Sequence, residues 1–379
     1  MHGAATEIVT EGSTRLAVPR VPPGAAPPRR PAFFNRAAAI TRDYSTLAYA
    51  ALGDPGSRTL LDAMAGVGAR GLRAANEAGV GRVVLNDSNP AALELARESA
   101  RIGGIGGIEY STGEACRFLS DHAGRGRRAD IVDLDPFGSP APYLDCAIRA
   151  VSAGGMLAVA ATDLQVLGGL WDGACRKKYG GVPVRTRYGN EVAIRLVLGC
   201  TWSVAARLGV GIEPLFAGSD KHYYRAYVRV TRNPRGGLGL ILHCRSCGQR
   251  DAAGEGRACR NCGAATEAAG PLWTGPLFEE GFVRAMMRAA EGAAVHGSCA
   301  PSLARCAAEA GMPAAYYTTD EVASRAGSGP PKLQDAIGRL RDAGFAASAT
   351  SLHPGGFRTD ADAGQVAAAL YPRNPRQAK

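Results

Sequence analysis

Residues 59–87 have the sequence TLLDAMAGVGARGLRAANEAGVGRVVLND. An apolar run ends at Asp62, and a glycine-rich turn and a helical stretch near 70–79 lead to a second apolar run from Arg82 to Asp87. A strand, a tight turn, a helix and a second strand in this order predict a βαβ unit, whose two strands lie parallel in one sheet.

The same alternation of apolar runs and helical stretches continues along the chain as far as residue 231. We expect helices near 90–102, 114–122, 141–152 and 189–208, and strands near 107–112, 130–135, 156–161, 211–216 and 223–231. Strands that alternate with helices predict a mainly parallel sheet covered on both faces, which is an α/β fold of the Rossmann type.

Two changes of composition divide the chain. Residues 1–32 contain a short hairpin pattern and a Pro-rich stretch, which predict an N-terminal arm. After the sequence NPRGG at 233–237, the pattern becomes Cys-rich and is no longer apolar-periodic, so we place the main boundary at residue 235. The sequence therefore predicts an α/β domain over 33–235 and a smaller α+β domain over 236–379.

The smaller domain contains further local patterns. Residues 240–268 form a cysteine-rich module, and 276–291 have the pattern of an amphipathic helix. Within 318–360 we expect a helix that Thr319 caps, a second helix and a hairpin that turns at Pro354-Gly355-Gly356. Two helices followed by a hairpin suggest a winged helix, which binds nucleic acid in some proteins and only packs against partners in others.

The charge of the chain indicates the kind of partner. Its 379 residues include 44 Lys and Arg against 34 Asp and Glu, and the net charge of +10 favours a polyanion such as nucleic acid. No run approaches the roughly 18 apolar residues that cross a bilayer. Residues 19–31 contain scattered Pro and Arg and lack the apolar core of a signal peptide. We therefore expect a cytoplasmic protein without a membrane partner.

The turn after the first strand, from Gly66 to Gly71, satisfies the pattern GxGxxG, and Asp87 ends the next strand. Glycine lets the backbone approach a ligand closely, and a carboxylate at the second strand end accepts hydrogen bonds from a ribose. A nicotinamide dinucleotide and S-adenosylmethionine both contain an adenosine ribose, so the turn alone fits either cofactor. Asp62, before the turn, and a polar motif after the fourth strand favour S-adenosylmethionine.

That polar motif, DLDPFGSP from Asp133 to Pro140, is the most informative segment of the chain. An amine conjugated to a ring is a poor nucleophile because its lone pair is delocalised. The Asp135 carboxylate and the Pro136 carbonyl can each accept an N–H bond from such an amine and localise its lone pair for attack on a methyl group. Phe137 offers a ring on which a base can stack. The motif predicts methylation of an exocyclic amino nitrogen of a nucleobase.

Two CxxC pairs, Cys244 with Cys247 and Cys259 with Cys262, are each followed by glycine. Four thiolates suit a closed, tetrahedral, structural zinc site, and the glycines allow the backbone to fold back round the sulfurs. The other cysteines occur singly, and we expect them to be buried reduced thiols; they are Cys116, Cys146, Cys175, Cys200, Cys299 and Cys306.

Basic and aromatic residues occur together in three segments, at 176–179, 185–188 and 221–225. Lysine and arginine suit phosphates, while aromatic rings suit unpaired bases or riboses. Together with the positive net charge, these segments predict a path for RNA over the surface.

The motifs together resemble those of the tRNA (guanine-26-N2)-dimethyltransferase family of archaea and eukaryotes. The resemblance covers nearly the whole chain and depends most on DLDPFGSP; it also includes Phe33-Phe34-Asn35, Arg42-Asp43, Asp62 to Arg70, Asn86-Asp87 and the CxxC pairs. It implies a class I methyltransferase domain that uses S-adenosylmethionine to place two methyl groups on N2 of guanine 26 in tRNA.

The resemblance also implies roles for single residues. Phe33, Asp135 and Phe137 match the target-base pocket, and Glu114-Ala115 match the pair that holds the adenine of the cofactor. With the turn residues, the expected cofactor contacts are Arg42, Asp62, Gly66, Gly68, Arg70, Asp87, Glu114 and Ala115. The chain departs from the family at Phe34-Asn35-Arg36, where Tyr-Asn-Pro is common, and at 65–68, where a Ser-rich turn is common.

Other functions share some of these motifs. An amino-methyltransferase that acts on rRNA guanine or DNA adenine would have a similar cofactor turn and a similar polar-Pro-aromatic motif. A zinc-containing RNA-binding protein with an inactive enzyme domain would not need Asp62, Asp87 and Asp135, and the presence of all three favours an active enzyme. A nicotinamide-dependent dehydrogenase would share the glycine-rich turn. Titration of the protein with both cofactors separates this alternative from a methyltransferase.

Overall fold

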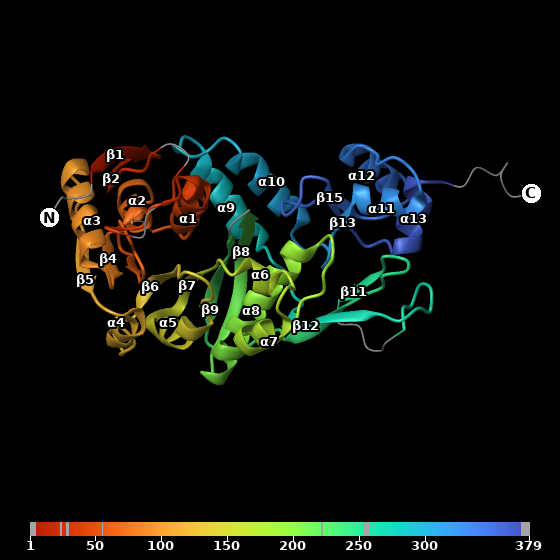
Figure 1. Ribbon diagram of the computed structural model, residues 1–379, viewed down its shortest axis with the longest axis horizontal. Helices are drawn as coiled ribbons and strands as arrows, with labels where there is room; N and C mark the ends of the chain where they lie inside the picture. Colours follow the sequence, from red (N-terminus) through yellow and green to blue (C-terminus); the bar gives the residue numbers. More distant parts are fainter. Residues whose placement is uncertain are drawn as a thin grey trace, which may run out of the picture.

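The computed structural model describes residues 5–22, 25–27, 30–54, 56–220, 223–252 and 258–372. Its largest sheet has seven strands in the order β5-β4-β3-β6-β7-β9-β8 (Figure 1). The strands are β3 (Thr59–Asp62), β4 (Arg82–Asp87), β5 (Ile108–Thr112), β6 (Ala129–Leu134), β7 (Val151–Ala161), β8 (Gly211–Asp220) and β9 (Tyr223–Thr231). The first five pair in parallel, and β9 runs antiparallel between β7 and β8. The predicted Rossmann-like, mainly parallel sheet is confirmed.

Helices cover both faces of this sheet. In Figure 1, the layer above it holds α1 (Ala39–Ala51), α2 (Ala69–Glu77) and α3 (Pro90–Gly103), and the layer below it holds α4 (Ala115–Asp121), α5 (Leu144–Ala150) and α8 (Gly189–Arg207). The apolar periodicity did not predict α1, because its buried face contains polar residues such as Thr41, Arg42 and Asp43. Within the part of the chain that the structure covers, none of the helices has the length and apolar character to span a bilayer.

The predicted N-terminal hairpin is present as β1 (Thr6–Glu11) and β2 (Thr14–Pro19). It is docked on the α/β layers and is not a detached arm. Leu16 is fully buried, and the Ser99 hydroxyl of α3 accepts a hydrogen bond from the Ala17 amide at 2.8 Å. The hairpin therefore covers one edge of the helix layer formed by α2 and α3.

Beyond residue 235, β10 (Leu238–His243), β11 (Arg250–Ala252) and β12 (Glu267–Trp273) form a small sheet in the order β11-β10-β12. Two further helices follow, α9 (Glu280–Ala290) and α10 (Cys299–Glu309). Leu272, Phe282 and Leu303 from these elements belong to the same hydrophobic cluster as the large sheet. The main core thus continues past residue 235, and the division of the chain at that point stays a prediction.

The last part of the chain has its own hydrophobic cluster. It contains β13 (Tyr317–Thr318), α11 (Thr319–Ala326), α12 (Leu333–Asp342), β14 (Ala347–Ala349), β15 (Gly356–Thr359) and α13 (Ala363–Leu370). The strands form a sheet in the order β13-β15-β14. The two predicted helices and the hairpin are therefore present. The cap differs by one residue, because the hydroxyl of Thr318, and not that of Thr319, accepts the Glu321 amide at 3.2 Å.

Buried ion pairs join this last cluster to the main core. Arg358 of β15 donates to Glu191 of α8 at 2.9 Å and also pairs with Glu309 of α10. Burial opposes ionisation of Glu191, but Arg358 and Arg195 outweigh it and hold the pKa of Glu191 at about 2. Glu191 therefore remains a carboxylate, and the two parts of the chain are held together by fully formed charges.

Candidate active site

A cavity of about 770 Å3 opens where β3, β4 and β6 end. In a parallel sheet the strand ends are where ligands bind, and this volume suits a ligand the size of a nucleoside cofactor. Eleven of the residues selected from the sequence line it: Phe33, Arg42, Asp62, Gly66, Arg70, Asp87, Glu114, Ala115, Asp135, Pro136 and Phe137. The fold thus brings together side chains that lie up to about a hundred residues apart in the sequence.

The two glycines of the turn lie in different environments. Gly66 has φ +54° and lines the cavity. Gly68 has φ +74°, and a Cβ there would lie 2.8 Å from the Cβ of Ala96 and 2.9 Å from a methyl group of Leu85. Gly68 is not among the lining residues, and its contact with the cofactor stays a prediction. Its lack of a side chain allows the start of α2 to pack against α3 and β4.

Asp87 holds this turn in place. One carboxylate oxygen accepts the Gly66 amide at 2.8 Å, and the other accepts the Asn89 amide, also at 2.8 Å. The carboxylate therefore lines the cavity in an orientation that the backbone on both sides of it fixes.

Asp62 is a buried acid without a hydrogen-bond partner for one of its oxygens. The register of β3 and β6 places it beside Asp133, and its side chain is 2% exposed. Within the described residues, its Oδ2 has no hydrogen-bond partner. Burial, and then the negative charge of Asp133, raise the pKa of Asp62 to about 8. An unsatisfied acid in the cavity wall fits a cationic group of a ligand.

Two buried guanidinium groups surround Asp133 and Asp135. Arg70 of α2 binds Asp135 and lies 3.6 Å from Asp133, and Arg225 of β9 binds Asp133. The Nη1 of Arg225 lies 3.9 Å from Asp135 and has no hydrogen-bond partner in the described part of the chain. Burial opposes ionisation of Asp135, but the charges of Arg70 and Arg225 outweigh it and lower its pKa. Asp135 is therefore held as a carboxylate at the cavity wall.

Two aromatic rings stand at the mouth of the cavity. The rings of Phe33 and Phe137 meet edge to face, with centroids 4.9 Å apart and planes at 83°. Phe137 is 69% exposed, although it is a large apolar side chain. Its loop is fixed by Thr162, whose hydroxyl accepts the Gly138 amide at 2.6 Å and whose amide donates to Gly138 at 2.8 Å. The exposed ring is thus presented by a well-anchored loop.

Arg42 and Glu114 line the cavity from two other elements. Arg42 is buried and bonds Glu11 of the N-terminal hairpin at 2.6 Å and the Asn35 carbonyl at 2.9 Å. Glu114 caps α4 by accepting the Arg117 amide at 2.9 Å. The hairpin and the start of α4 therefore contribute to the shape of the cavity.

Comparison with known proteins identifies the family. The profile of the N2,N2-dimethylguanosine tRNA methyltransferases matches residues 12–371. The chain belongs to this family. It is 35% identical to the tRNA (guanine(26)-N(2))-dimethyltransferase of Methanothermobacter thermautotrophicus, over 94% of this chain and 97% of that one. The protein of the same name from Methanopyrus kandleri is 36% identical over 89% of each chain.

A solved structure supports the same assignment. The complex of Trm1 from Pyrococcus horikoshii with S-adenosyl-L-methionine has a TM-score of 0.83 to this chain at 28% sequence identity. The match covers 96% of this chain and 99% of that chain. The dimethyltransferase fold therefore extends over both hydrophobic clusters described above.

In this family member, the predicted zinc module is a compact cluster. The sulfurs of Cys244 and Cys262 lie 3.5 Å apart, as do those of Cys247 and Cys259, and all four lie within 4.8 Å of one another. Tetrahedral zinc with bonds of about 2.3 Å places its sulfurs roughly 3.8 Å apart. Each glycine after a pair folds back as expected, for example Gly248, whose amide donates to the Cys244 carbonyl at 2.9 Å. The donor set and its spacing fit zinc.

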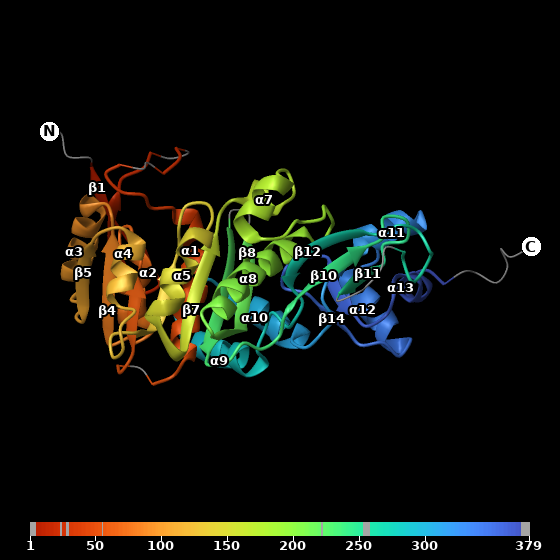
Figure 2. The same cartoon turned by 90° about the horizontal axis from the view of Figure 1, so that it is seen from below.

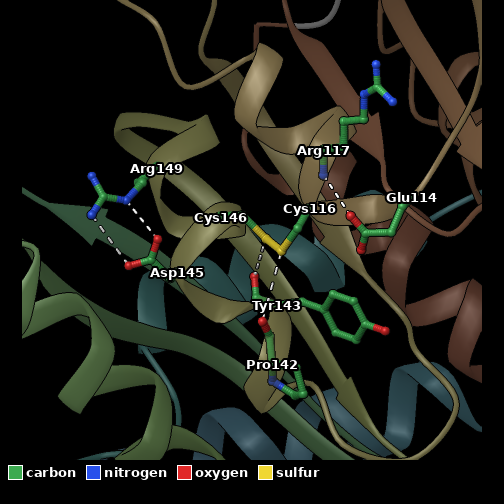
Figure 3. Close-up of a disulfide and its surroundings, with 8 residues drawn as sticks. All are labelled: Glu114, Cys116, Arg117, Pro142, Tyr143, Asp145, Cys146 and Arg149. Atoms are coloured by element: carbon green, nitrogen blue, oxygen red, sulfur yellow. Dashed lines mark hydrogen bonds and ion pairs between the residues drawn. A yellow bond between two sulfur atoms is a disulfide. The ribbon is translucent and has the colours of Figure 1, made fainter.

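The prediction that all remaining cysteines are reduced thiols was wrong for two of them. Cys116 of α4 and Cys146 of α5 form a disulfide, and Cys116 is partly exposed (Figure 3). They are separated by 30 residues in the sequence, and their proximity arises only because α4 and α5 pack side by side. Glu114 and Tyr143, which line the cavity, are drawn close to this bond in Figure 3.

The predicted RNA path is also partly wrong for this methyltransferase. Tyr179 and Tyr188 are buried, and so is Arg225, which belongs to the network around Asp135. Lys221 and His222 lie outside the described residues. The sequence did not indicate the role of Arg225, because that role depends on the antiparallel position of β9 beside β7.

Proposed function

We propose that this protein transfers two methyl groups from S-adenosylmethionine to the exocyclic N2 of guanine 26 in tRNA. The observation that carries the proposal is the position of an ionised Asp135 beside Phe33 and Phe137 at the mouth of a cofactor-sized cavity. Membership of the dimethyltransferase family supports the choice of nitrogen and of nucleic acid.

The cavity wall suits the cofactor at three places. The backbone of Gly66 allows close approach of the cofactor, and Asp87 lies where a ribose is expected. The Asp62 carboxyl, whose Oδ2 lacks a hydrogen-bond partner among the described residues, lines the part of the cavity that would receive the cationic methionine end. The resemblance assigns the adenine to Glu114 and Ala115, and further contacts to Arg42 and Arg70. When bound, the cofactor supplies an electrophilic methyl group on its sulfonium sulfur.

The chain's own residues prepare the guanine amine. Phe33 and Phe137 would hold the base by ring contacts once it has left its helix. Asp135 and the Pro136 carbonyl would accept the N–H bonds of the amine and localise its lone pair. Because Arg70 and Arg225 lower the pKa of Asp135, this carboxylate suits hydrogen-bond acceptance better than storage of a proton.

Asp62 gives a test of the cofactor position. With a pKa of about 8, its carboxyl holds a proton at pH 7, and an arriving ammonium group favours the carboxylate, so binding should release that proton. Affinity for S-adenosylhomocysteine should therefore rise as pH rises from 6 to 8. Calorimetric titration in two buffers of different ionisation enthalpy measures the release.

Asp62→Asn should show neither the release nor the pH dependence. Asp130→Asn is the matched control, since Asp130 accepts the Thr59 amide at 2.9 Å at the other end of the same strands. Equal proton release by the wild type and by Asp62→Asn would show that Asp62 does not contact the ammonium group of the cofactor.

We infer that the four cysteines hold structural zinc, because four thiolates at this spacing leave no open position for catalysis. We also propose the domain division 1–32, 33–235 and 236–379, with a winged helix over 318–360. The order β13-β15-β14, with α11 and α12 before the hairpin, supports this last assignment. With tRNA as substrate, we place the protein in the cytoplasm.

Mass spectrometry of nucleosides tests the reaction. We expect a tRNA transcript incubated with the protein and labelled cofactor to yield N2,N2-dimethylguanosine. A transcript with adenine in place of guanine 26 is the control and should yield none. Parallel incubations use DNA or rRNA in place of tRNA. Label on the adenine of DNA or on rRNA would contradict the proposed function, and so would label at another tRNA position in both transcripts.

A further inference from the structure

Residues 164–187, here called the α6–α7 lobe, follow two residues after Thr162, which lines the cavity. The lobe contains α6 (Leu164–Leu167), α7 (Asp172–Tyr179) and the segment that leads to α8. Figure 2 shows α7 projecting from the body of the molecule. Leu167 and Cys175 are fully buried and Tyr179 is 3% exposed, so the lobe is anchored in the main core.

Two large apolar side chains between these helices face solvent. Leu170 is 53% exposed and Trp171 is 60% exposed. Among the described residues, five large apolar side chains are exposed, and three of them are Phe137, Leu170 and Trp171. Their concentration in the cavity rim and the adjoining lobe distinguishes them from the single exposed apolar residues that are normal on protein surfaces.

Hydrogen bonds connect the lobe directly to the base-holding loop. Thr162, which bonds Gly138, is followed by Asp163, and the carboxylate of Asp163 accepts the Tyr179 hydroxyl at 2.5 Å. That hydroxyl also interacts with Ser139 of the DLDPFGSP motif. Phe137 and α7 are therefore parts of one connected structure.

The lobe that presents the apolar pair also has five exposed cations. They are Arg176, Lys177, Lys178, Arg185 and Arg187. The Nε of Arg185 donates to the Gly169 carbonyl at 2.8 Å, next to Leu170 in the chain. Lys178 pairs with Asp163 at 3.2 Å, whereas Arg176, Lys177 and Arg187 have no carboxylate partner within the described ranges. The positive charge of this surface is largely uncompensated.

We propose that the α6–α7 lobe binds the tRNA strand beside the target guanine, an inference that rests on the proposed function. The Trp171 indole stacks on a base or ribose of that strand, and Arg176, Lys177 and Arg185 contact its phosphates. The five exposed cations favour RNA over a protein partner, because their positive charge is largely uncompensated and a strand of phosphates supplies the opposite charge along its whole length. An exposed aromatic ring such as that of Trp171 can stack on an unpaired base. Large exposed rings held on an anchored loop are uncommon on surfaces that bind nothing.

Intrinsic fluorescence tests the contact directly. The chain has three tryptophans. Trp273 is 5% exposed and Trp202 is only partly exposed, so Trp171 is the most exposed of them. Unmodified tRNA should quench the emission of the wild-type protein, and Trp171→Leu should lose most of this quenching.

Affinity measurements give an independent readout. Trp171→Ala should weaken tRNA binding by about five-fold or more, as expected for the loss of one stacked base, while Trp171→Phe stays close to wild type. The double variant Arg176→Ala/Lys177→Ala should reduce the slope of log affinity against log salt by about two. Arg288→Ala on α9, on the opposite side of the molecule in Figure 2, is the matched control and should change neither quantity.

The outcomes separate this proposal from the proposed function. Unchanged tRNA affinity and unchanged quenching in the Trp171 variants would overturn the docking surface, even if the wild type methylates guanine 26. Self-association that disappears in Trp171→Ala, with tRNA affinity unchanged, would identify a protein partner and overturn it as well. A wild type that shows the quenching and the variant effects but forms no dimethylguanosine would contradict the proposed function and support the surface.

Discussion

Replacement of Asp135 by alanine should lower the rate of methyl transfer by about a hundred- to a thousand-fold, the range seen when one preorganised hydrogen-bonding group is removed from an active site. The reason is that the guanine amine loses the acceptor that localises its lone pair. Affinity for S-adenosylhomocysteine should stay within a few-fold of wild type, because Arg70 keeps Asp133 at 3.6 Å as a neighbouring charge. Single-turnover methylation and calorimetry measure the two quantities separately.

Two variants serve as controls. Asp135→Asn keeps one carbonyl oxygen and should retain a trace of activity. Asp130→Asn changes a carboxyl group at the other end of β6, at a residue that does not line the cavity, and it should leave the rate near wild type. Parallel loss of cofactor affinity and rate in both Asp135 variants would show that Asp135 serves the cofactor and not the base.

Removal of the proposed zinc ion, by chelation or by Cys259→Ser, should unfold the cysteine-rich module and weaken tRNA binding by roughly ten-fold or more. Metal binding contributes about 10 kcal/mol or more to the folding free energy of such small modules. The loss should extend to α11, because Arg325 donates to the Arg245 and Ser246 carbonyls at 2.9 Å each. Cofactor affinity should survive, since the four thiols are not among the residues that line the cavity.

Ser246→Ala is the matched control, because Ser246 is exposed and lies between two ligands without being one. It should bind zinc and tRNA as the wild type does. Metal analysis, circular dichroism and tRNA binding at several salt concentrations measure the effect, and the salt dependence of the zinc-free protein should be shallower. Unchanged tRNA affinity and salt dependence after complete loss of zinc would show that the module does not help to bind the substrate.

The sequence was sufficient for features that depend on local patterns. The strands and helices around the main sheet follow from period and turn residues, and the strand ends then bring Asp62, Asp87 and Asp135 to one edge. The CxxC pairs likewise determine their own geometry, because each pair and its glycine form a local turn. These predictions needed no knowledge of which distant segments meet.

Apart from the one-residue shift of the cap of α11, the features that were missed depend on contacts between distant segments. Helix α1 has a polar buried face because Asp43 pairs with Arg73 of α2 at 2.7 Å. Such a face lacks the apolar stripe by which a buried helix is recognised in a sequence. Arg225 reaches Asp133 only because β9 lies beside β7. The exposure of Trp171 follows from how α6 and α7 are anchored, which the composition of the segment does not reveal.

The ion pairs of Arg358 have a thermodynamic consequence. If the last hydrophobic cluster separated from the main core, Arg358 would leave Glu191 and Glu309, and a charge of this group that stayed buried without its partner would cost about 3–5 kcal/mol. Partial unfolding at this junction is therefore disfavoured relative to the loss of both clusters together. The two cores are expected to melt as one cooperative unit, so that a molecule with an intact cofactor cavity also keeps its C-terminal part in place.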